Sequence, residues 1–254
     1  MQNKSLTYNL HNLINLIDMK KPSRIWLHLL LLSLTIFVFT SSCKKDNDNN
    51  LSSSETVKDI DGNTYHTVTI GTQVWMAENL KTTKYRNGDV IPNITNKSSW
   101  IYLTTGALCD YSNSPISSAK YGKLYNWFAV DDNRNIAPTG WRVASNSDWE
   151  TLMLFLGGEN TAGGKLKETG VLNWLSPNFG ATNSSGFTAL PSGGRGDYGD
   201  FFGIGEVSNW WTTDNPTTLS DENSSTTYIY SNEESLGRTF ADRNLGFSVR
   251  CIKN

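Results

Sequence analysis

The sequence predicts an α+β domain of antiparallel strands with one main helix, one short helix and long loops held by aromatic side chains. Strand-like alternation lies near residues 57–70, the clearest helical periodicity lies near 145–156, and short strand patterns follow to the C-terminus. Helices and strands are thus segregated instead of alternating as in βαβ units, which favours α+β. Eight of the nine Trp follow residue 43, together with many Gly, Asn and Ser, a composition that fits aromatic-pinned loops better than a helical bundle.

The alternating segment 57–70 predicts a β-hairpin. Asp61, Gly62 and Asn63 have the composition of its turn, and polar and apolar residues alternate after them. Residues 71–72 form a second turn signal, so residues 73–76 are expected to be a short strand that continues the sheet.

The segment after residue 144 predicts the main helix. Ser145 or Ser147 can cap it, and Ser147 with Glu150 has the spacing of a capping box. A Gly pair at 157–158 ends it. Three apolar side chains fall at helical spacing on one face, namely Trp149, Leu152 and Leu156.

The remaining elements are expected to be short. A helix is expected from about Leu124, and the second short helix over 163–169. The strand candidates of one antiparallel sheet are residues 201–202, 210–213, 226–230, 238–240 and 247–252.

The N-terminal segment has the pattern of a secretory signal. Residues 26–39 are a run of 14 mostly apolar residues, shorter than the roughly 20 that a membrane-spanning helix needs. Lys20, Lys21 and Arg24 precede this run and supply the positive charge of a signal peptide. We expect translation to start at Met19, because the residues before it add nothing to the pattern.

Cys43 is the expected lipidation site. It follows three small residues at the end of the apolar run and so resembles a lipobox, although Thr40 stands where the usual pattern has Leu. Residues 1–43 are therefore expected to be a signal segment that leaves a lipid-anchored protein. The alternatives are an ordinary signal peptide with an unmodified Cys, and a retained membrane anchor.

Residues 44–56 predict a flexible tether, because they are polar and cannot bury a core. The charged cluster just after Cys43 also resembles the surface-export signals of Bacteroidota lipoproteins. This resemblance implies an outer-membrane protein on the cell surface, with the membrane as its partner through the lipid. A plain solvated linker is the alternative.

Charge argues against nucleic acid as a partner. The chain has a formal charge of −2, and removing the leader's four basic residues and one acidic residue brings it to −5. No basic run remains, whereas nucleic-acid and electrostatic membrane binding need one.

Two cysteines remain for the domain at 57–254. Cys109 and Cys251 would form a disulfide in an oxidising compartment, and buried free thiols are the alternative. Two isolated Cys do not have zinc-ligand spacing. His66 is the one His after residue 43. A His-rich metal centre is therefore not expected, and a Ser-His-Asp triad would have this single His to use.

Six ordered blocks across residues 57–253 together carry a family resemblance. The blocks are residues 70–80 (IGTQVWMAENL), 121–127 (YGKLYNW), 137–143 (APTGWRV), 163–168 (GGKLKE), 186–191 (GFTALP) and 246–251 (GFSVRC). They resemble the Fibrobacter succinogenes major paralogous domain, a family with a poorly defined biochemical role. The resemblance implies a C-type lectin-like fold, which the formylglycine-generating enzymes share. It implies the fold more firmly than an activity.

The same resemblance does not predict an enzyme. The active-site Cys pair of the formylglycine-generating enzymes is absent, and adjacent carboxylates such as Asp131 and Asp132 are expected to be solvated loop charges. We therefore expect no catalytic residues and no cofactor.

No metal site is expected, although calcium binding remains an alternative because the chain has suitable oxygen ligands. Asp197, Asp200, Glu206 and Asp214 could supply oxygen ligands. The EF-hand spacing and the motifs of calcium-dependent lectins are both missing.

Clustered aromatics are the best indication of a ligand site. Tyr198, Phe201, Trp210 and Trp211 stand near Asp214, and exposed rings could stack on sugars while the carboxylate bonds hydroxyls. The alternative is that Trp210 and Trp211 are core or loop-pinning residues. Because adjacent residues of a strand point to opposite sides, we expect this of at least one of them.

The sequence therefore predicts a surface binding module for a glycan or a protein partner. A structural or assembly component of the cell envelope is the alternative, and an enzyme of unknown type is a lesser one.

Overall fold

The structure, a computed structural model, describes residues 55–214 and 223–254. Residues 53–254 form one compact unit. Cys43, the expected signal segment and nearly all of the expected tether lie outside the described residues. Within the described residues, no helix is long and apolar enough to cross a membrane.

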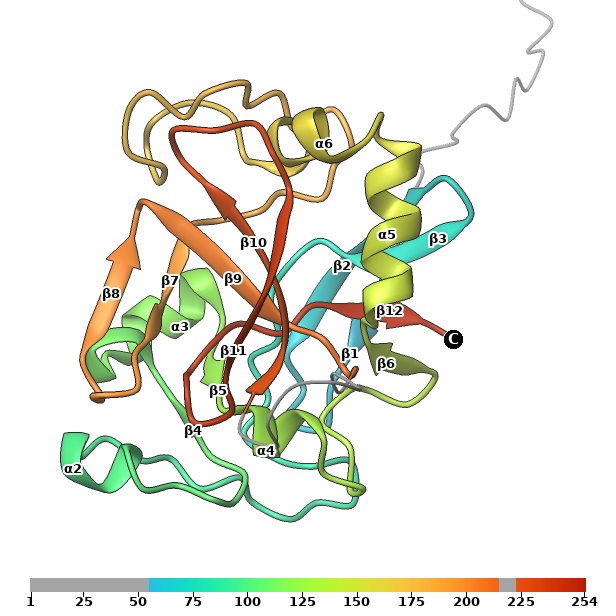
Figure 1. Cartoon of the computed structure of the whole chain (residues 1–254). Coiled ribbons are helices and arrows are strands. Elements are labelled where there is room, and N and C mark those ends of the chain that lie inside the picture. The colour runs from blue at the N-terminus through green and yellow to red at the C-terminus, as the bar shows by residue number, and fades with distance from the viewer. Residues whose placement is uncertain (1–54, 215–222) are drawn as a thin grey trace, which may run out of the picture. The chain divides into compact units, whose positions relative to one another are not determined.

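The first sheet joins the two ends of the domain (Figure 1). Its order is β1-β2-β3-β12-β6, with antiparallel pairing throughout. The predicted hairpin and the strand after it are confirmed. The last strand lies between β3 and β6, so residues from the start, middle and end of the domain become neighbours. The strands are β1 (Thr56–Lys58), β2 (Thr64–Ile70), β3 (Gln73–Met76), β12 (Cys251–Lys253) and β6 (Trp141–Val143).

The second sheet has the order β11-β10-β9-β7-β8. Only the pairing of β7 with β9 is parallel, through Gly193 and Ser208. The prediction of one antiparallel C-terminal sheet was therefore wrong: four of the candidate strands lie here, whereas the final one, β12, joins the first sheet. The strands are β7 (Ser192–Arg195), β8 (Phe201–Ile204), β9 (Val207–Trp211), β10 (Asn223–Tyr230) and β11 (Gly237–Asp242).

Short helices and a two-stranded sheet occupy the middle of the chain. The described part has more helices than the one main and one short helix predicted. The helix expected from Leu124 begins at Trp127, because Leu124 and Tyr125 pair with β4. These elements are α2 (Lys97–Trp100), β4 (Leu108–Cys109), the 3-10 helix η1 (Tyr111–Asn113), α3 (Pro115–Tyr121), β5 (Leu124–Tyr125), α4 (Trp127–Val130), α5 (Asn146–Phe155) and α6 (Glu159–Leu166).

The capping box of the main helix, α5, lies two residues before the expected pair of Ser147 and Glu150. Ser145, the other expected cap, is the N-cap, and its partner in the capping box is Asp148. Asp148 also pairs with Arg142 from β6, which fixes this choice. Glu150 lies in solvent.

Helix α6 starts at Glu159, before the predicted residue 163. Gly163 and Gly164 lie inside it, where a Cβ would stand 2.2 Å from the carbonyl oxygen of Ser235 and 2.3 Å from that of Gly180. Glycine is therefore required here, because the backbones pack closely. From the sequence alone, a Gly pair inside a helix looks the same as a Gly pair at its start.

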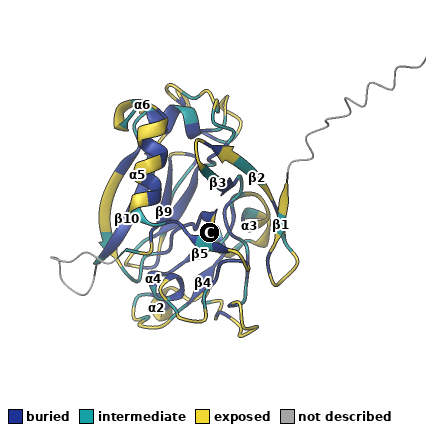
Figure 2. Cartoon of the chain, turned by 90° about the vertical axis from the view of Figure 1, so that its right-hand side faces the viewer, coloured by how far each residue is buried: buried dark blue, intermediate teal, exposed yellow. Residues whose placement is uncertain are grey.

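Strand β9 separates the two main apolar clusters. Every residue of β9 is buried, as Figure 2 shows. Trp210 packs with Trp75 and Trp149 in one cluster, while Trp211 packs with Phe247 in the other. Since neighbouring side chains of a strand point to opposite faces, this strand supplies one indole to each cluster. The buried face of α5 lies against both sheets, because its Trp149 shares a cluster with residues of β3 and β9.

Candidate functional site

The two tryptophans that the sequence suggested for ligand binding do not reach the surface. Trp210 and Trp211 are fully buried. Both ring nitrogens are also engaged: Trp210 Nε1 donates to Asn79 Oδ1 at 2.8 Å, and Trp211 Nε1 donates to the carbonyl oxygen of Tyr125 at 2.8 Å. The expectation failed because a strand between two clusters has no solvent face.

The other three predicted ligand-binding residues are not brought into one concave site. Tyr198 is 75% exposed, and Phe201 packs beside Tyr111 with ring centroids 5.2 Å apart. Asp214 accepts a hydrogen bond from the backbone N–H of Asn146. None of these residues lines the pocket described below.

The acidic residues considered for calcium are also dispersed. In residues 55–214 and 223–254, no group of three or more His, Cys, Asp or Glu could hold a metal ion. Asp200 instead forms an exposed ion pair with Lys97 at 2.5 Å.

The expected disulfide is not formed in the structure. Cys109 and Cys251 are free and buried. Cys109 lies on β4 beside Trp100, whereas Cys251 lies on β12 in the cluster of Trp211. The two thiols belong to different clusters, so the alternative of buried free thiols describes them.

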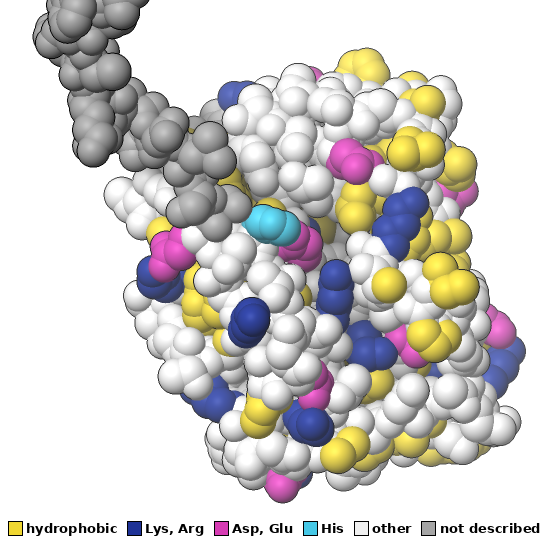
Figure 3. All heavy atoms as spheres, turned by 180° about the vertical axis from the view of Figure 1, so that it is seen from behind, with side chains coloured by type: hydrophobic (Ala, Val, Ile, Leu, Met, Phe, Trp, Pro, Cys, Tyr) yellow, Lys and Arg dark blue, Asp and Glu magenta, His cyan; other side chains and the backbone are white. Residues whose placement is uncertain are grey.

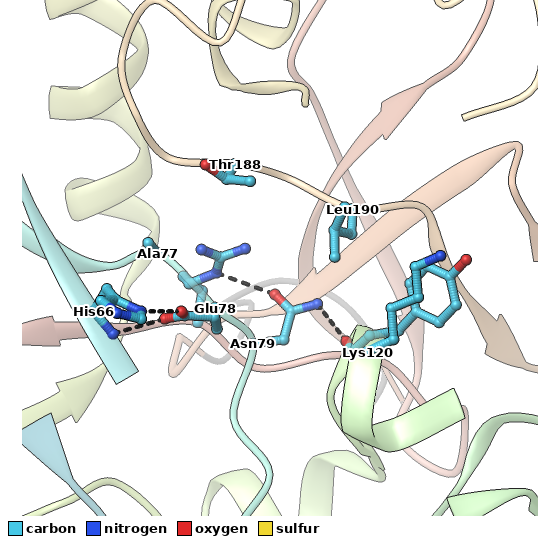
Figure 4. Close-up of a pocket in the computed structure, with 9 residues that line it drawn as sticks. His66, Ala77, Glu78, Asn79, Lys120, Thr188 and Leu190 are labelled. Atoms are coloured by element: carbon cyan, nitrogen blue, oxygen red, sulfur yellow. Dashed lines mark hydrogen bonds and ion pairs between the residues drawn. The ribbon is translucent and has the colours of Figure 1, made fainter. Parts of the chain in front are cut away.

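A pocket of about 280 Å³ opens where five segments meet. Figure 3 shows the face that carries His66, the histidine of the described chain, with an acidic side chain and a hollow lined by basic side chains beside it. In Figure 4, Ala77–Asn79 form one wall, Thr188 and Leu190 lie across from them, and Lys120 lies at the opposite end from His66. The lining residues are His66, Ala77, Glu78, Asn79, Lys120, Tyr121, Thr188, Leu190 and Arg250.

One end of the pocket is closed by His66 and Glu78. The carboxylate accepts from the backbone N–H of His66 at 2.8 Å and lies 2.7 Å from its Nδ1. His66 projects from β2, and Glu78 follows β3, its neighbour in the sheet. The two contacts hold the carboxylate at the mouth while its remaining lone pairs stay open to a ligand.

Asn79 forms the floor and connects the pocket to the core. Its Nδ2 donates to the carbonyl oxygen of Tyr121 at 2.8 Å and to Ser248 Oγ at 3.2 Å. Its Oδ1 accepts from Trp210 Nε1 at 2.8 Å and from Arg250 Nε at 3.1 Å. All four hydrogen-bonding positions of the amide are therefore used within the protein.

Arg250 supplies a buried positive charge. Its side chain is 1% exposed, and its Nη1 donates to the carbonyl oxygens of Met76 at 2.8 Å and Phe187 at 3.0 Å. Burial lowers the pKa of Arg250 to about 9, and the charge of Glu78 opposes this shift. No carboxylate of the described chain forms an ion pair with it.

Thr188 lines the pocket in an unusual backbone conformation. Its φ is +54°, a region that β-branched residues avoid. Asn183 stabilises this conformation, since its Oδ1 accepts from Thr188 N at 2.9 Å and its Nδ2 donates to Thr188 Oγ1 at 3.0 Å. Such strain is concentrated at functional sites in proteins, and here it presents the 187–190 segment to the pocket.

This pocket was not predicted from the sequence. His66, Glu78, Lys120, Thr188 and Arg250 come from distant segments, and each is unremarkable within its own stretch. The only available signal was that most of them lie in or beside the sequence blocks that carry the family resemblance. A concave site in which a few polar groups converge beside apolar side chains is typical of small-ligand binding.

Comparison with known proteins supports the resemblance and adds no further relative. Neither a curated protein nor a solved structure matches the chain. The model of the family described as the Fibrobacter succinogenes major domain matches residues 68–253, a range that holds every lining residue of the pocket except His66. The chain therefore belongs to the Fibrobacter succinogenes major domain family.

Proposed function

We propose that this protein is a lipid-anchored binding module of the cell envelope and that the His66–Arg250 pocket holds one residue of a glycan. We further propose that the two sheets and α5 are a form of the C-type lectin-like fold. The observation that carries the proposal is the pocket itself, which charged and polar side chains from distant segments line together with Tyr121. The signal-like N-terminus and Cys43 support placement at the envelope.

The size of the pocket fits one sugar ring. Its volume of about 280 Å³ is at the lower end of small-molecule sites, which are roughly 300–1,000 Å³. A longer glycan would therefore place one residue inside and extend the rest over the surface.

The chemistry of the lining also fits a sugar. Glu78 and His66 can bond hydroxyls at one end, and Thr188 lies across from them, where its hydroxyl oxygen keeps one lone pair beyond its bonds with Asn183 and Gly186. At the other end, the half-buried ring of Tyr121 presents an apolar surface of the kind that sugar rings cover. Leu190 and Ala77 add apolar contact.

A glycan-array screen of the full chain, with and without calcium, tests the proposal. We expect specific binding that is lost in Tyr121→Ala and in Glu78→Gln. Tyr198→Ala is the matched control, because Tyr198 is an exposed tyrosine outside the pocket. Binding that is lost in the control and kept in the pocket variants would move the site to the 195–214 loops and contradict the proposal.

An assembly role is the second candidate, and one surface favours it. Four large apolar side chains are exposed within nine residues of one loop, including Leu172, which is 89% exposed. Exposed apolar groups in such number on one loop are typical of protein contacts. Cross-linking in intact envelopes tests this role when the natural protein is compared with Leu172→Ser. The assembly role requires that the natural protein cross-links to one defined partner and that the variant does not. The four residues are Val171, Leu172, Leu175 and Phe179.

A further inference from the structure

We infer that the pocket selects a sugar that carries a carboxylate, a hexuronic acid residue, through the free edge of the buried Arg250 guanidinium. This inference rests on the proposed glycan-binding function and names the class of sugar. It is carried by an unfilled donor on a buried cation, by a second cation at the same pocket and by the position of Glu78.

The guanidinium of Arg250 leaves one nitrogen unused. Nε and Nη1 bond to Asn79, Met76 and Phe187, while Nη2 has no hydrogen-bond partner among the described residues. Because Arg250 lines the pocket, Nη2 is the donor that remains for a ligand.

Arg195 shows that this arrangement is not general for buried arginines of the domain. It is equally buried, at 1% exposure, yet its three nitrogens donate to three carbonyl oxygens. Nε bonds to Gly199 at 3.0 Å, Nη1 to Ile94 at 2.6 Å and Nη2 to Thr95 at 3.1 Å. Arg195 is thus satisfied by the backbone, whereas Arg250 has both an unused donor and an adjoining pocket.

A buried cation without a counter-ion is costly, and an anion that reaches it is correspondingly favoured. Lys120 at the other end of the pocket adds to this preference. It is exposed, and its Nζ lies 5.2 Å from the centroid of the Tyr121 ring. Arg250 and Lys120 are positively charged and Glu78 is negatively charged, so the pocket carries a net positive charge even when His66 is neutral.

The anion that fits this charge distribution is a carboxylate. A carboxylate accepts hydrogen bonds from a guanidinium edge and carries a single negative charge. A phosphate would bring a further negative charge near Glu78, which would repel it. Glu78 and His66 instead suit the hydroxyls of the same sugar ring, while the carboxylate of that ring bonds to Arg250 and lies on the side toward Lys120.

Calorimetric titration of the full chain with matched oligosaccharides tests the inference. The probes are trimers of galacturonate and glucuronate, their methyl esters, the corresponding neutral hexose trimers, and a short peptide with a free C-terminus. We expect the acids to bind at least about tenfold more tightly than their esters and neutral counterparts, as a charge-assisted bond to a buried cation would give.

Variants assign this preference to the pocket. Lys120→Gln should weaken acid binding about two- to fivefold without affecting the fold, because Lys120 is exposed. Arg250→Lys should remove the preference for the acid over the ester, with circular dichroism reporting whether the fold is kept. Lys58→Gln is the matched control, since Lys58 is an exposed lysine that lines a different pocket, and it should leave binding unchanged.

The outcomes separate the inference from the function on which it rests. Equal affinity for acid, ester and neutral sugar overturns the inference and keeps the glycan-binding proposal. Binding of the peptide carboxylate with no sugar bound overturns both, as does the absence of binding to every glycan. An acid preference that Lys120→Gln and Lys58→Gln reduce equally also overturns the inference, because it would then reflect net charge.

Discussion

Arg250 Nε donates to Asn79 Oδ1 at 3.1 Å, across 171 residues of chain. The bond joins the residue that precedes β12 to the segment that follows β3. Trp210 Nε1 donates to the same oxygen, so the buried indole that was expected to stack on a ligand instead positions the floor of the pocket. Pocket and core are therefore one hydrogen-bonded structure, and changes at Asn79 should affect both.

Replacing Asn79 with Ala should lower the free energy of unfolding and weaken ligand binding together. The change leaves the buried Trp210 N–H and the Nε of Arg250 without an acceptor, and unsatisfied buried groups cost about 1–3 kcal/mol each. We expect a total loss of about 2–5 kcal/mol, measured by chemical denaturation. Asn87→Ala, in an exposed turn, is the control and should have little effect. A loss below about 1 kcal/mol in Asn79→Ala would contradict the network.

Free thiols at Cys109 and Cys251 should be unreactive in the folded protein. Burial raises the pKa of each thiol to about 12, so little thiolate is present at neutral pH. Titration with a thiol reagent without reductant, on a Cys43→Ser chain, should find no reactive thiol in buffer and both in denaturant. If denaturant without reductant exposes neither thiol, the two cysteines are paired and the structure is wrong at this point.

The pair Asp148 and Arg142 should make stability depend on acid pH. Burial raises the pKa of Asp148, but hydrogen bonds from Arg142 and Ser145 outweigh it and hold the pKa below its ordinary value. The folded carboxyl therefore binds its proton less readily than the unfolded one, and its contribution to stability is present above about pH 4 and lost as pH falls through the folded pKa.

Asp148→Asn should thus be less stable than the natural protein by about 1–2 kcal/mol at neutral pH, from the lost capping box and ion pair. Denaturation curves at several pH values should show the difference shrinking below pH 4. Glu150→Gln is the control on the exposed face of the same helix, where Glu150 forms only an exposed ion pair with Arg238 at 3.7 Å, and it should change stability little. A difference that is constant with pH would show that the charge of Asp148 is not what stabilises the helix.

The sequence predicted the local elements well and the site poorly, and the reason is physical. The hairpin at 57–70 and the apolar face of α5 follow from periodicity, which depends on neighbours in the chain. The burial of Trp210 and Trp211 depends on β9 lying between β10 and β7, a long-range arrangement that periodicity does not contain. The pocket likewise exists only because β12 pairs beside β3, which brings Arg250 to Asn79.

The glycines of α6 show the same limit and offer a direct test of the packing. A Cβ at Gly163 would stand 2.2 Å from the carbonyl oxygen of Ser235, a backbone atom that cannot turn aside. Gly163→Ala should therefore lower the free energy of unfolding by at least about 1–3 kcal/mol, although Ala favours helices more than Gly does. Gly196→Ala is the matched control, because the nearest atom to its Cβ would be 3.6 Å away. Thermal melts of both variants decide the point: equal stability in Gly163→Ala and the control would mean that α6 does not pack against residues 234–235 as the structure shows.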